Sequence, residues 1–322
     1  MKRSRIIAIA VLVLLVAAYF IARTKQPVEK DIRFFSADSS AVAKICLSTP
    51  QDTVIAVKQG KLWRLTHPVD WEANDTQLGL FFSKVLKAKT SSTSISEDLT
   101  QQGMYKVDPT NAVQVKLFDA HNRLLDHVFI GNGTNSTFEY GRHEGDARIY
   151  QFKDNLTNIV RPDIYNWRSP KITNIRLTNV SRIDVVYTKN AYTLFVAGDS
   201  IRYTDKHESF AIPPGNRALY KIVNALENLL TYQFIDKETH QYDAAFTHPD
   251  CRITVYMKDK SRRTFTLIRQ EEKIVPASAA SEQKSITVFM KVDDKPLPLY
   301  EMTGDFLNRF TRASGHFKVE FE

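Results

Sequence analysis

The group of residues most suited to chemistry flanks a turn in the second half of the chain. His240, Asp243, His248 and Asp250 are of the types that bind metal ions or act as an acid and base pair. They surround a His-Pro turn that leads into a strand pattern, where Asp and His also occur for backbone reasons. We favour this backbone role over a metal or catalytic site.

A second group lies between residues 131 and 146. Residues 131–135 (GNGTN) carry consecutive amides that could bind an anion, but the strand pattern that follows is typical of a hairpin loop. Glu139, Glu144 and Asp146 could offer oxygen ligands to Ca²⁺, yet their spacing matches no known calcium loop. We predict a charged hairpin surface, with no cofactor and no metal.

Three tryptophans could form a carbohydrate or peptide platform, because flat rings offer a large contact area. Trp63 lies in a strand pattern and is expected to pack in the core. Trp71 and Trp167 are the candidates for a ligand or partner surface, and Trp71, which precedes a helix, is the better exposed candidate. The sequence contains no Gly-x-Ser-x-Gly, His-Glu-x-x-His, Cys-x-x-Cys or phosphate-loop pattern. We therefore expect no catalytic residues and a protein that is not an enzyme.

The elements that position these residues occur twice. Residues 113–117 (VQVKL) match residues 253–257 (ITVYM) at an offset of 140, with the same alternation of apolar side chains. Each copy reads as three strands, a helix, about four strands and a short helix. Beyond this region the second copy has an insertion at residues 276–281 (PASAAS), which is typical of a surface loop.

This order predicts an α+β fold. We expect two tandem, divergent repeats of mostly antiparallel sheet with covering helices, preceded by one N-terminal transmembrane helix. The predicted segments are a membrane anchor (1–25), a linker (26–42), a first repeat (43–167), a connector (168–180) and a second repeat (181–322).

The predicted anchor is an uninterrupted apolar run of 17 residues, 6–22, flanked by basic residues. At about 1.5 Å per residue it just reaches across a bilayer, and Ile6, Leu14, Tyr19 and Ile21 are its representative residues. The charge ahead of the run places the N-terminus in the cytoplasm and the body outside. A cleaved signal peptide is the alternative, because small residues lie at 16–18. Both interpretations export the body.

The net charge of +8, taken alone, suggests a protein that binds nucleic acid. The distribution of this charge along the chain does not support that function. Five basic residues and no acidic ones lie within the first 25 positions, so the body is nearly balanced. Its charges are interspersed and form no basic stripe, which excludes nucleic acid as an expected partner. Cys46 and Cys251 are the two cysteines. We favour buried free thiols over a disulfide, which an exported compartment would permit.

Four motifs carry a resemblance to a known family. Residues 62–68 (LWRLTHP), 104–109 (MYKVDP), 129–131 (FIG) and 149–150 (IY) follow the order and spacing of the domain of unknown function 4340 family, which the chain resembles. Lys106 stands where that family usually has glycine, and Ile201 stands in the second copy at the place of Trp63. The resemblance implies an envelope accessory role, in some cases beside ABC-transporter components, and supplies no catalytic residues.

The sequence thus favours a non-enzymatic, membrane-anchored envelope protein that acts as a binding or scaffold component of an ABC-transporter system. Its expected partners are the membrane and another envelope protein. The expected location is the bacterial inner membrane, in a single pass with the body on the periplasmic side. The alternative is an envelope glycan- or peptide-binding module, or a hydrolase, that uses a crevice between the two repeats.

Overall fold

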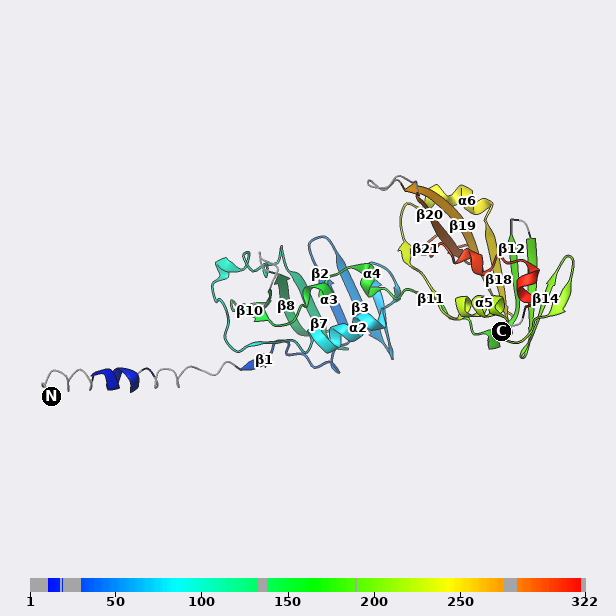
Figure 1. Ribbon diagram of the computed structural model, residues 1–322. Coiled ribbons are helices and arrows are strands. Elements are labelled where there is room, and N and C mark those ends of the chain that lie inside the picture. Colours follow the sequence, from blue (N-terminus) through cyan, green and yellow to red (C-terminus); the bar gives the residue numbers. More distant parts are fainter. Residues whose placement is uncertain are drawn as a thin grey trace. The chain divides into compact units, whose positions relative to one another are not determined.

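The computed structural model describes residues 11–17, 19, 30–132, 138–188, 190–274 and 283–319. The chain divides into two compact units, Met1–Ser169 and Pro170–Glu322 (Figure 1). Each unit is built on one large sheet whose neighbouring strands are antiparallel. A third, two-stranded sheet in the second unit pairs β11 (Lys171–Thr173) with β16 (Leu229–Leu230).

The first sheet has ten strands in the order β1-β6-β10-β9-β8-β7-β2-β3-β4-β5. They are β1 (Asp31–Arg33), β2 (Lys44–Ser48), β3 (Thr53–Gln59), β4 (Leu62–His67), β5 (Trp71–Glu72), β6 (Lys89–Ser91), β7 (Val113–Phe118), β8 (Leu124–Asn132), β9 (Glu139–His143) and β10 (Tyr150–Phe152).

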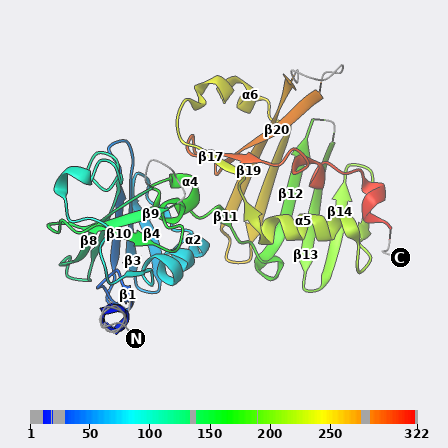
Figure 2. The ribbon, with the colours of Figure 1, turned by 60° about the vertical axis from the view of Figure 1, so that its left-hand side comes forward.

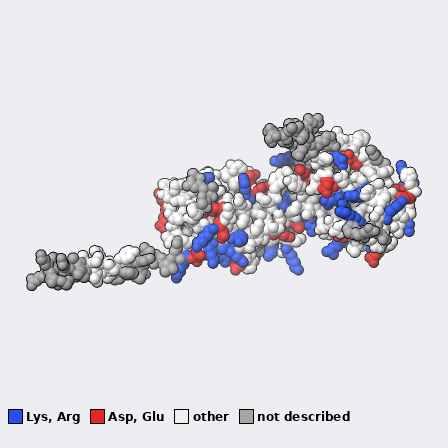
Figure 3. Space-filling view, in the orientation of Figure 1, with Lys and Arg blue, Asp and Glu red and all other residues white. Residues whose placement is uncertain are grey.

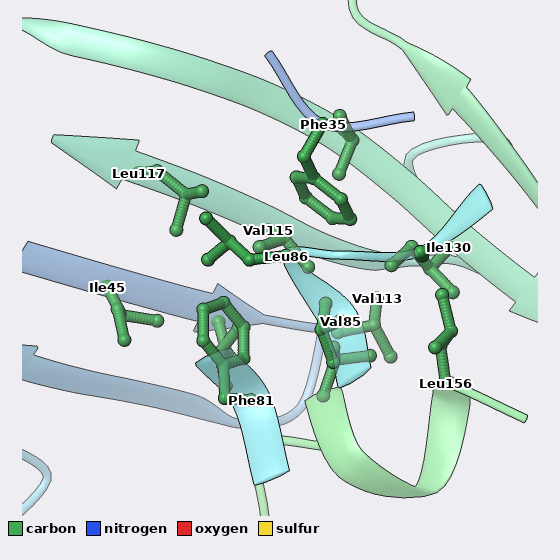
Figure 4. Close-up of a cluster of buried hydrophobic side chains, with 14 of the residues drawn as sticks. Phe35, Ile45, Phe81, Val85, Leu86, Val113, Val115, Leu117, Ile130 and Leu156 are labelled. Carbon is green, nitrogen blue, oxygen red and sulfur yellow. The ribbon is translucent and has the colours of Figure 1, made fainter. Parts of the chain in front are cut away.

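One face of the first sheet forms the main core of the unit. Successive side chains of a strand point to opposite faces, so Val113, Val115 and Leu117 of β7 are buried while the residues between them are half-buried. Figure 4 shows these three packed with Ile45 of β2 and Phe81. The helices on this face are α2 (Asp75–Leu80), the π-helical turn η1 (Phe81–Val85), α3 (Thr157–Val160) and α4 (Ile164–Trp167).

The other face of the first sheet is covered over β8 and β9 by the segment that contains η2 (Leu99–Gln101). A small second cluster joins Val107, Ala112 and Ile149 to Phe129, whose side chain lies on the opposite face from its neighbours in β8. This segment holds the motif at residues 104–109.

The second sheet has nine strands in the order β15-β14-β13-β12-β18-β19-β20-β21-β17. They are β12 (Val180–Tyr187), β13 (Asn190–Ala197), β14 (Ser200–Asp205), β15 (Ser209–Ala211), β17 (Gln233–Ile235), β18 (Cys251–Met257), β19 (Arg262–Ile274), β20 (Gln283–Val292) and β21 (Leu299–Met302). The helical elements are η3 (Leu177–Asn179), α5 (Arg217–Glu227), η4 (Thr239–Tyr242), α6 (Asp243–Thr247), η5 (Leu307–Arg309) and η6 (Ser314–Phe317).

Helix α5 lies across one face of the second sheet (Figure 2). It begins at the cap residue Asn216, whose side chain accepts a hydrogen bond from the Leu219 amide at 2.9 Å. Its own residues Ile222 and Leu226 are buried. On the other face, Phe246 of α6 packs in a separate cluster with strand residues from β19 to β21.

The two sheets share one strand order. Reading β6, β10, β9, β8, β7, β2, β3, β4, β5 across the first sheet gives, in the second, β17, β21, β20, β19, β18, β12, β13, β14, β15. Strand β1 is an addition to the first sheet. Strands β7 and β18, which hold the segments matched at an offset of 140, therefore occupy equivalent central places. The predicted insertion at residues 276–281 lies outside the described residues.

The predicted fold class is wrong in two respects. The described residues form three sheets with few helices, so antiparallel sheet dominates and the α+β description is incorrect. The apolar spacing from Leu78 to Leu86 predicted one covering helix, and residues 75–85 are helical there, as α2 and the π-helical turn η1 that directly follows it. A helix this short depends on packing against the sheet.

The second respect is the predicted transmembrane helix. Residues 11–17 and 19, which include Leu14 and Tyr19, are helical, and Ile6 and Ile21 lie outside the described residues. Within the described ranges, no helix is long and apolar enough to cross a membrane.

Charged side chains of both signs are spread over both units on the face that Figure 3 draws. No large surface of one sign appears on this face, in keeping with the balanced charge of the body.

Candidate functional site

The first unit has a polar cavity of about 740 Å³ beside the turn between β2 and β3. Three chain segments line it, and a cavity of this size could hold a peptide loop or a small molecule. The lining residues are Thr49, Gln51, Asp52, Thr53, His67, Pro68, Arg161, Pro162, Asp163, Ile164 and Tyr165.

One wall of the cavity is the start of α4. Asp163 has an extended backbone and its Oδ1 accepts a hydrogen bond from the Tyr165 amide at 3.0 Å, so it caps this short helix. In this position the Tyr165 side chain is 57% exposed. Arg161, four residues earlier in the chain, is also exposed. An exposed tyrosine and arginine thus stand on a wall that the backbone fixes.

Two tryptophans attach this wall to the rest of the unit. The Nε1 of Trp167 donates to the carbonyl oxygen of Arg161 at 3.0 Å, and its ring packs against Phe81 with centroids 5.9 Å apart. The Nε1 of Trp71 donates to the carbonyl oxygen of Ser169 at 3.0 Å, and the Arg168 guanidinium carbon lies 4.7 Å from the centre of the Trp71 rings.

These positions bear on the predicted tryptophan surface. Trp167 is 0% exposed, so it has no surface to offer a ligand or partner, and it acts as a core residue. Trp71 is half-buried, and its surface role stays a prediction. Trp63 is also half-buried and packs against Phe82 with ring centroids 5.6 Å apart.

The opposite wall is the turn between β2 and β3 together with the end of β4. The Thr49 amide donates to the carbonyl oxygen of Asp52 at 2.8 Å, and the Asp52 amide donates to Oγ1 of Thr49 at 3.1 Å. This closed turn leaves the Asp52 side chain exposed. The peptide bond from His67 to Pro68 is cis, and both residues are exposed.

The chemistry of the cavity is that of hydrogen bonding. It offers a guanidinium from Arg161, an imidazole from His67, a carboxylate from Asp52 and a phenol from Tyr165. Apolar contact comes from Pro68 and the partly buried Ile164. Tyrosine and arginine are enriched among the residues that dominate protein interfaces. This mixture of groups suits a polar peptide segment of a partner.

Sequence reasoning did not single out His67, Arg161 or Tyr165. The local signal was an Asp directly before the short run 164–167, which is a helix-cap pattern, followed by an exposed aromatic residue. That residues 49–53 would face this segment depends on pairing of distant strands, and no local pattern encodes it.

The motif at residues 104–109 has a structural role. Lys106 has a positive φ of 53°, which favours glycine, and a Cβ added at Gly131 would lie 2.0 Å from its carbonyl oxygen. Tyr105 packs edge-on against Tyr140 with ring centroids 4.8 Å apart. Glycine at 131 therefore lets the motif loop approach the sheet backbone.

Arg142 fixes the same loop from within the sheet. It is 5% exposed, and its Nε donates to the carbonyl oxygen of Val107 at 3.2 Å. Its guanidinium carbon lies 4.3 Å from the centre of the Phe129 ring. Burial lowers the pKa of Arg142, although nearby carboxylates oppose this effect.

The turn group of the second unit forms no cluster in the described residues. His240 Nδ1 lies 3.2 Å from Asp243 Oδ2, and the His240 side chain is 97% exposed. Oδ2 of Asp250 accepts a hydrogen bond from the Arg269 amide at 2.6 Å, which is a backbone role. In the parts of the chain that the structure describes, no three His, Cys, Asp or Glu side chains are grouped to hold a metal ion.

The three carboxylates considered for Ca²⁺ have separate partners. Glu139 is buried and accepts hydrogen bonds from the backbone amides of Leu156 and Thr157, at the start of α3. Asp146 pairs with Arg148 at 2.7 Å, and the exposed Glu144 lies 3.9 Å from Nη1 of Arg142. Residues 133–137 of the glycine-containing loop lie outside the described residues.

Both cysteines are free thiols. Cys46 is half-buried in β2 and Cys251 is buried in β18. Burial raises the pKa of both thiols, and it raises that of Cys251 to about 12.

Comparison with known proteins identifies one family. No curated protein and no solved structure matches the chain. The family described as "Domain of unknown function (DUF4340)" matches residues 63–245, which is more than half of the 322 residues. This match spans the motif at 104–109, Gly131 and the cavity wall at residues 161–165. The chain therefore belongs to the DUF4340 family.

Proposed function

We propose that this chain is a non-enzymatic accessory component of the bacterial envelope, which binds another envelope protein through the polar cavity of its first unit. The proposed location of both units is the extracytoplasmic side. The support for this location is the apolar run 6–22 with basic residues ahead of it, which is typical of a segment that directs export of the chain.

The observation that carries the binding proposal is the cavity wall formed by residues 161–165. Tyr165 and Arg161 project from a segment that two indole hydrogen bonds and a helix cap hold in place. A side chain on a fixed backbone loses less conformational freedom on binding than one on a free loop, so more of its contact energy becomes affinity. Tyrosine also brings a large contact area with few rotatable bonds.

The family motifs support a scaffold role in the same unit. Gly131, Lys106 and Arg142 hold the motif loop on the sheet through backbone contacts and burial. The sequence resemblance to envelope proteins that accompany ABC transporters favours a transporter component as the partner. The fixed motif loop and the family resemblance both agree with a domain that presents a rigid binding surface to a partner protein.

The proposal is tested by co-purification of the full chain in mild detergent. A double variant, Tyr165→Ala with Arg161→Gln, should recover a specific membrane partner at least about tenfold less well than the wild type, as expected when a central aromatic and arginine pair is lost. The matched control is Tyr232→Ala with Arg202→Gln, since both residues are exposed in the second unit. Equal recovery with the two double variants, or no reproducible partner with the wild type, would contradict the proposal.

A further inference from the structure

The second unit has a cavity of about 400 Å³ between α5 and the segment around η5. Basic side chains and amides dominate its lining. The lining residues are Tyr220, Lys221, Asn224, Asp305, Asn308, Arg309 and Arg312.

The positive charge of this cavity is only partly neutralised. Asp305 is its one carboxylate, and it pairs with Arg309 at 3.5 Å. Within the described parts of the chain, no hydrogen bond or ion pair engages the Lys221 ammonium or the Arg312 guanidinium. The Nε of Arg312 is buried and lacks a hydrogen-bond partner. The lining therefore carries more positive than negative charge, which favours an anion.

The backbone that carries these cations is held by the sheet. The Tyr187 hydroxyl donates to the carbonyl oxygen of Arg312 at 3.1 Å, and the Tyr192 hydroxyl donates to that of Phe310 at 2.8 Å. Oδ1 of Asn308 accepts from Arg269 at 3.3 Å, which leaves the Asn308 amide group able to donate elsewhere. The backbone at residues 310 and 312 is therefore held in place before a ligand arrives.

The equivalent place in the first unit has a different contact. There Nε2 of Gln77 in α2 donates to the carbonyl oxygen of Ile159 in α3 at 2.7 Å, which is a neutral hydrogen bond. The two units therefore differ here in the described residues, although they share one strand order.

We propose that the cavity lined by Lys221, Arg309 and Arg312 binds a phosphate group. The guanidinium of arginine presents several N–H donors in one plane and matches the oxygens of phosphate, while lysine adds a point charge. The Asn224 and Asn308 amides supply neutral donors. The cavity is larger than a phosphate ion alone, so the group belongs to a phospholipid head group or to a small soluble phosphate ester, with the 68% exposed Tyr220 at its side.

Calorimetry on the full chain in neutral detergent at low ionic strength tests this site. The probes are inorganic phosphate, dihexanoyl phosphatidylglycerol and dihexanoyl phosphatidylcholine. The two lipids are short-chain lipids used below the concentration at which they form micelles, and they replace vesicles because the N-terminal apolar residues would bind any vesicle. Saturable binding of phosphatidylglycerol but not of phosphate assigns a lipid head group. Saturable binding of inorganic phosphate assigns a soluble ester. Binding of no probe overturns the proposal.

Variants of the lining residues test whether the binding uses this cavity. Lys221→Gln with Arg312→Gln should weaken binding at least about tenfold, the factor expected from losing one charge-assisted hydrogen bond. The control pair Lys206→Gln with Arg202→Gln, on exposed residues elsewhere in the unit, should leave it unchanged. Asp305→Asn should tighten binding, because it removes the carboxylate that competes for Arg309. Unchanged binding in the cavity variants, or weaker binding in Asp305→Asn, overturns the proposal.

Discussion

Gly131 and Lys106 approach so closely that a methyl group cannot be placed between them. A Cβ at position 131 would lie 2.0 Å from the carbonyl oxygen of Lys106 and 2.6 Å from its carbonyl carbon. Both atoms belong to the backbone, so neither can rotate away as a side chain could. The contact joins the motif loop at residues 104–109 to the end of β8.

The first prediction is that Gly131→Ala destabilises the protein by about 1–3 kcal/mol, the usual cost of overpacking. The measurement is the free energy of unfolding in urea. The control is Gly79→Ala in α2, where an added Cβ meets nothing within 4 Å. There alanine should raise stability by about 0.5–1 kcal/mol. Equal effects of the two substitutions would show that the close contact is absent.

The second prediction concerns Lys106, whose φ of 53° is unfavourable for a residue with a side chain. Lys106→Gly should leave the free energy of unfolding unchanged or raise it by about 0.5 kcal/mol, because the relief of strain outweighs the added freedom of the unfolded chain. Lys116→Gly, in the regular strand β7, should lower it by about 1 kcal/mol. A loss of stability in Lys106→Gly as large as in Lys116→Gly would contradict the left-handed backbone.

The third prediction separates two carboxylates that the sequence offers equally. Glu139→Ala should lower the free energy of unfolding by about 1–3 kcal/mol, because two backbone amides at the start of α3 lose their acceptor. Glu144→Ala removes only a partly exposed ion pair with Arg142 and should lower it by less, about 0.5–1 kcal/mol. Equal losses of stability in the two variants would contradict these separate roles.

The fourth prediction follows from the raised pKa values of the thiols. Only the thiolate reacts with iodoacetamide, and burial keeps both thiols protonated near pH 8. Cys46, which is half-buried, should be alkylated slowly, and Cys251 only after unfolding in urea. Mass spectrometry of peptides after timed labelling measures both rates. Faster labelling of Cys251 than of Cys46 in the folded protein would contradict the buried environment.

Some of this structure could be predicted from sequence and some could not. The alternation at residues 113–117 indicates a strand with one buried face, and the buried set of β7 is the set that the pattern marks. The apolar spacing at residues 78–86 indicated a helix there but not the change from α2 to a π-helical turn at Phe81, because periodicity reports which face is buried and not the hydrogen-bond pattern.

The candidate sites were less visible than the strands. Trp167 was assigned to a surface, since nothing local reveals that residues 161–169 fold back onto the core. Lys221 and Arg312 are far apart in the chain and meet only because α5 packs against η5. A site assembled from distant segments depends on the order of the strands in the sheet. Local patterns in one sequence do not reveal that order.

Photo-crosslinking tests whether the cavity wall at residues 161–165 contacts another envelope protein. A benzophenone amino acid is placed at Tyr165 in the full chain in the cell, and at the exposed Leu62 of the same unit as a control. We expect one discrete adduct with an envelope protein from position 165, lost when Arg161 is changed to Gln, and no such adduct from position 62. The same adducts from both positions, or none from position 165, would contradict a binding role for this cavity.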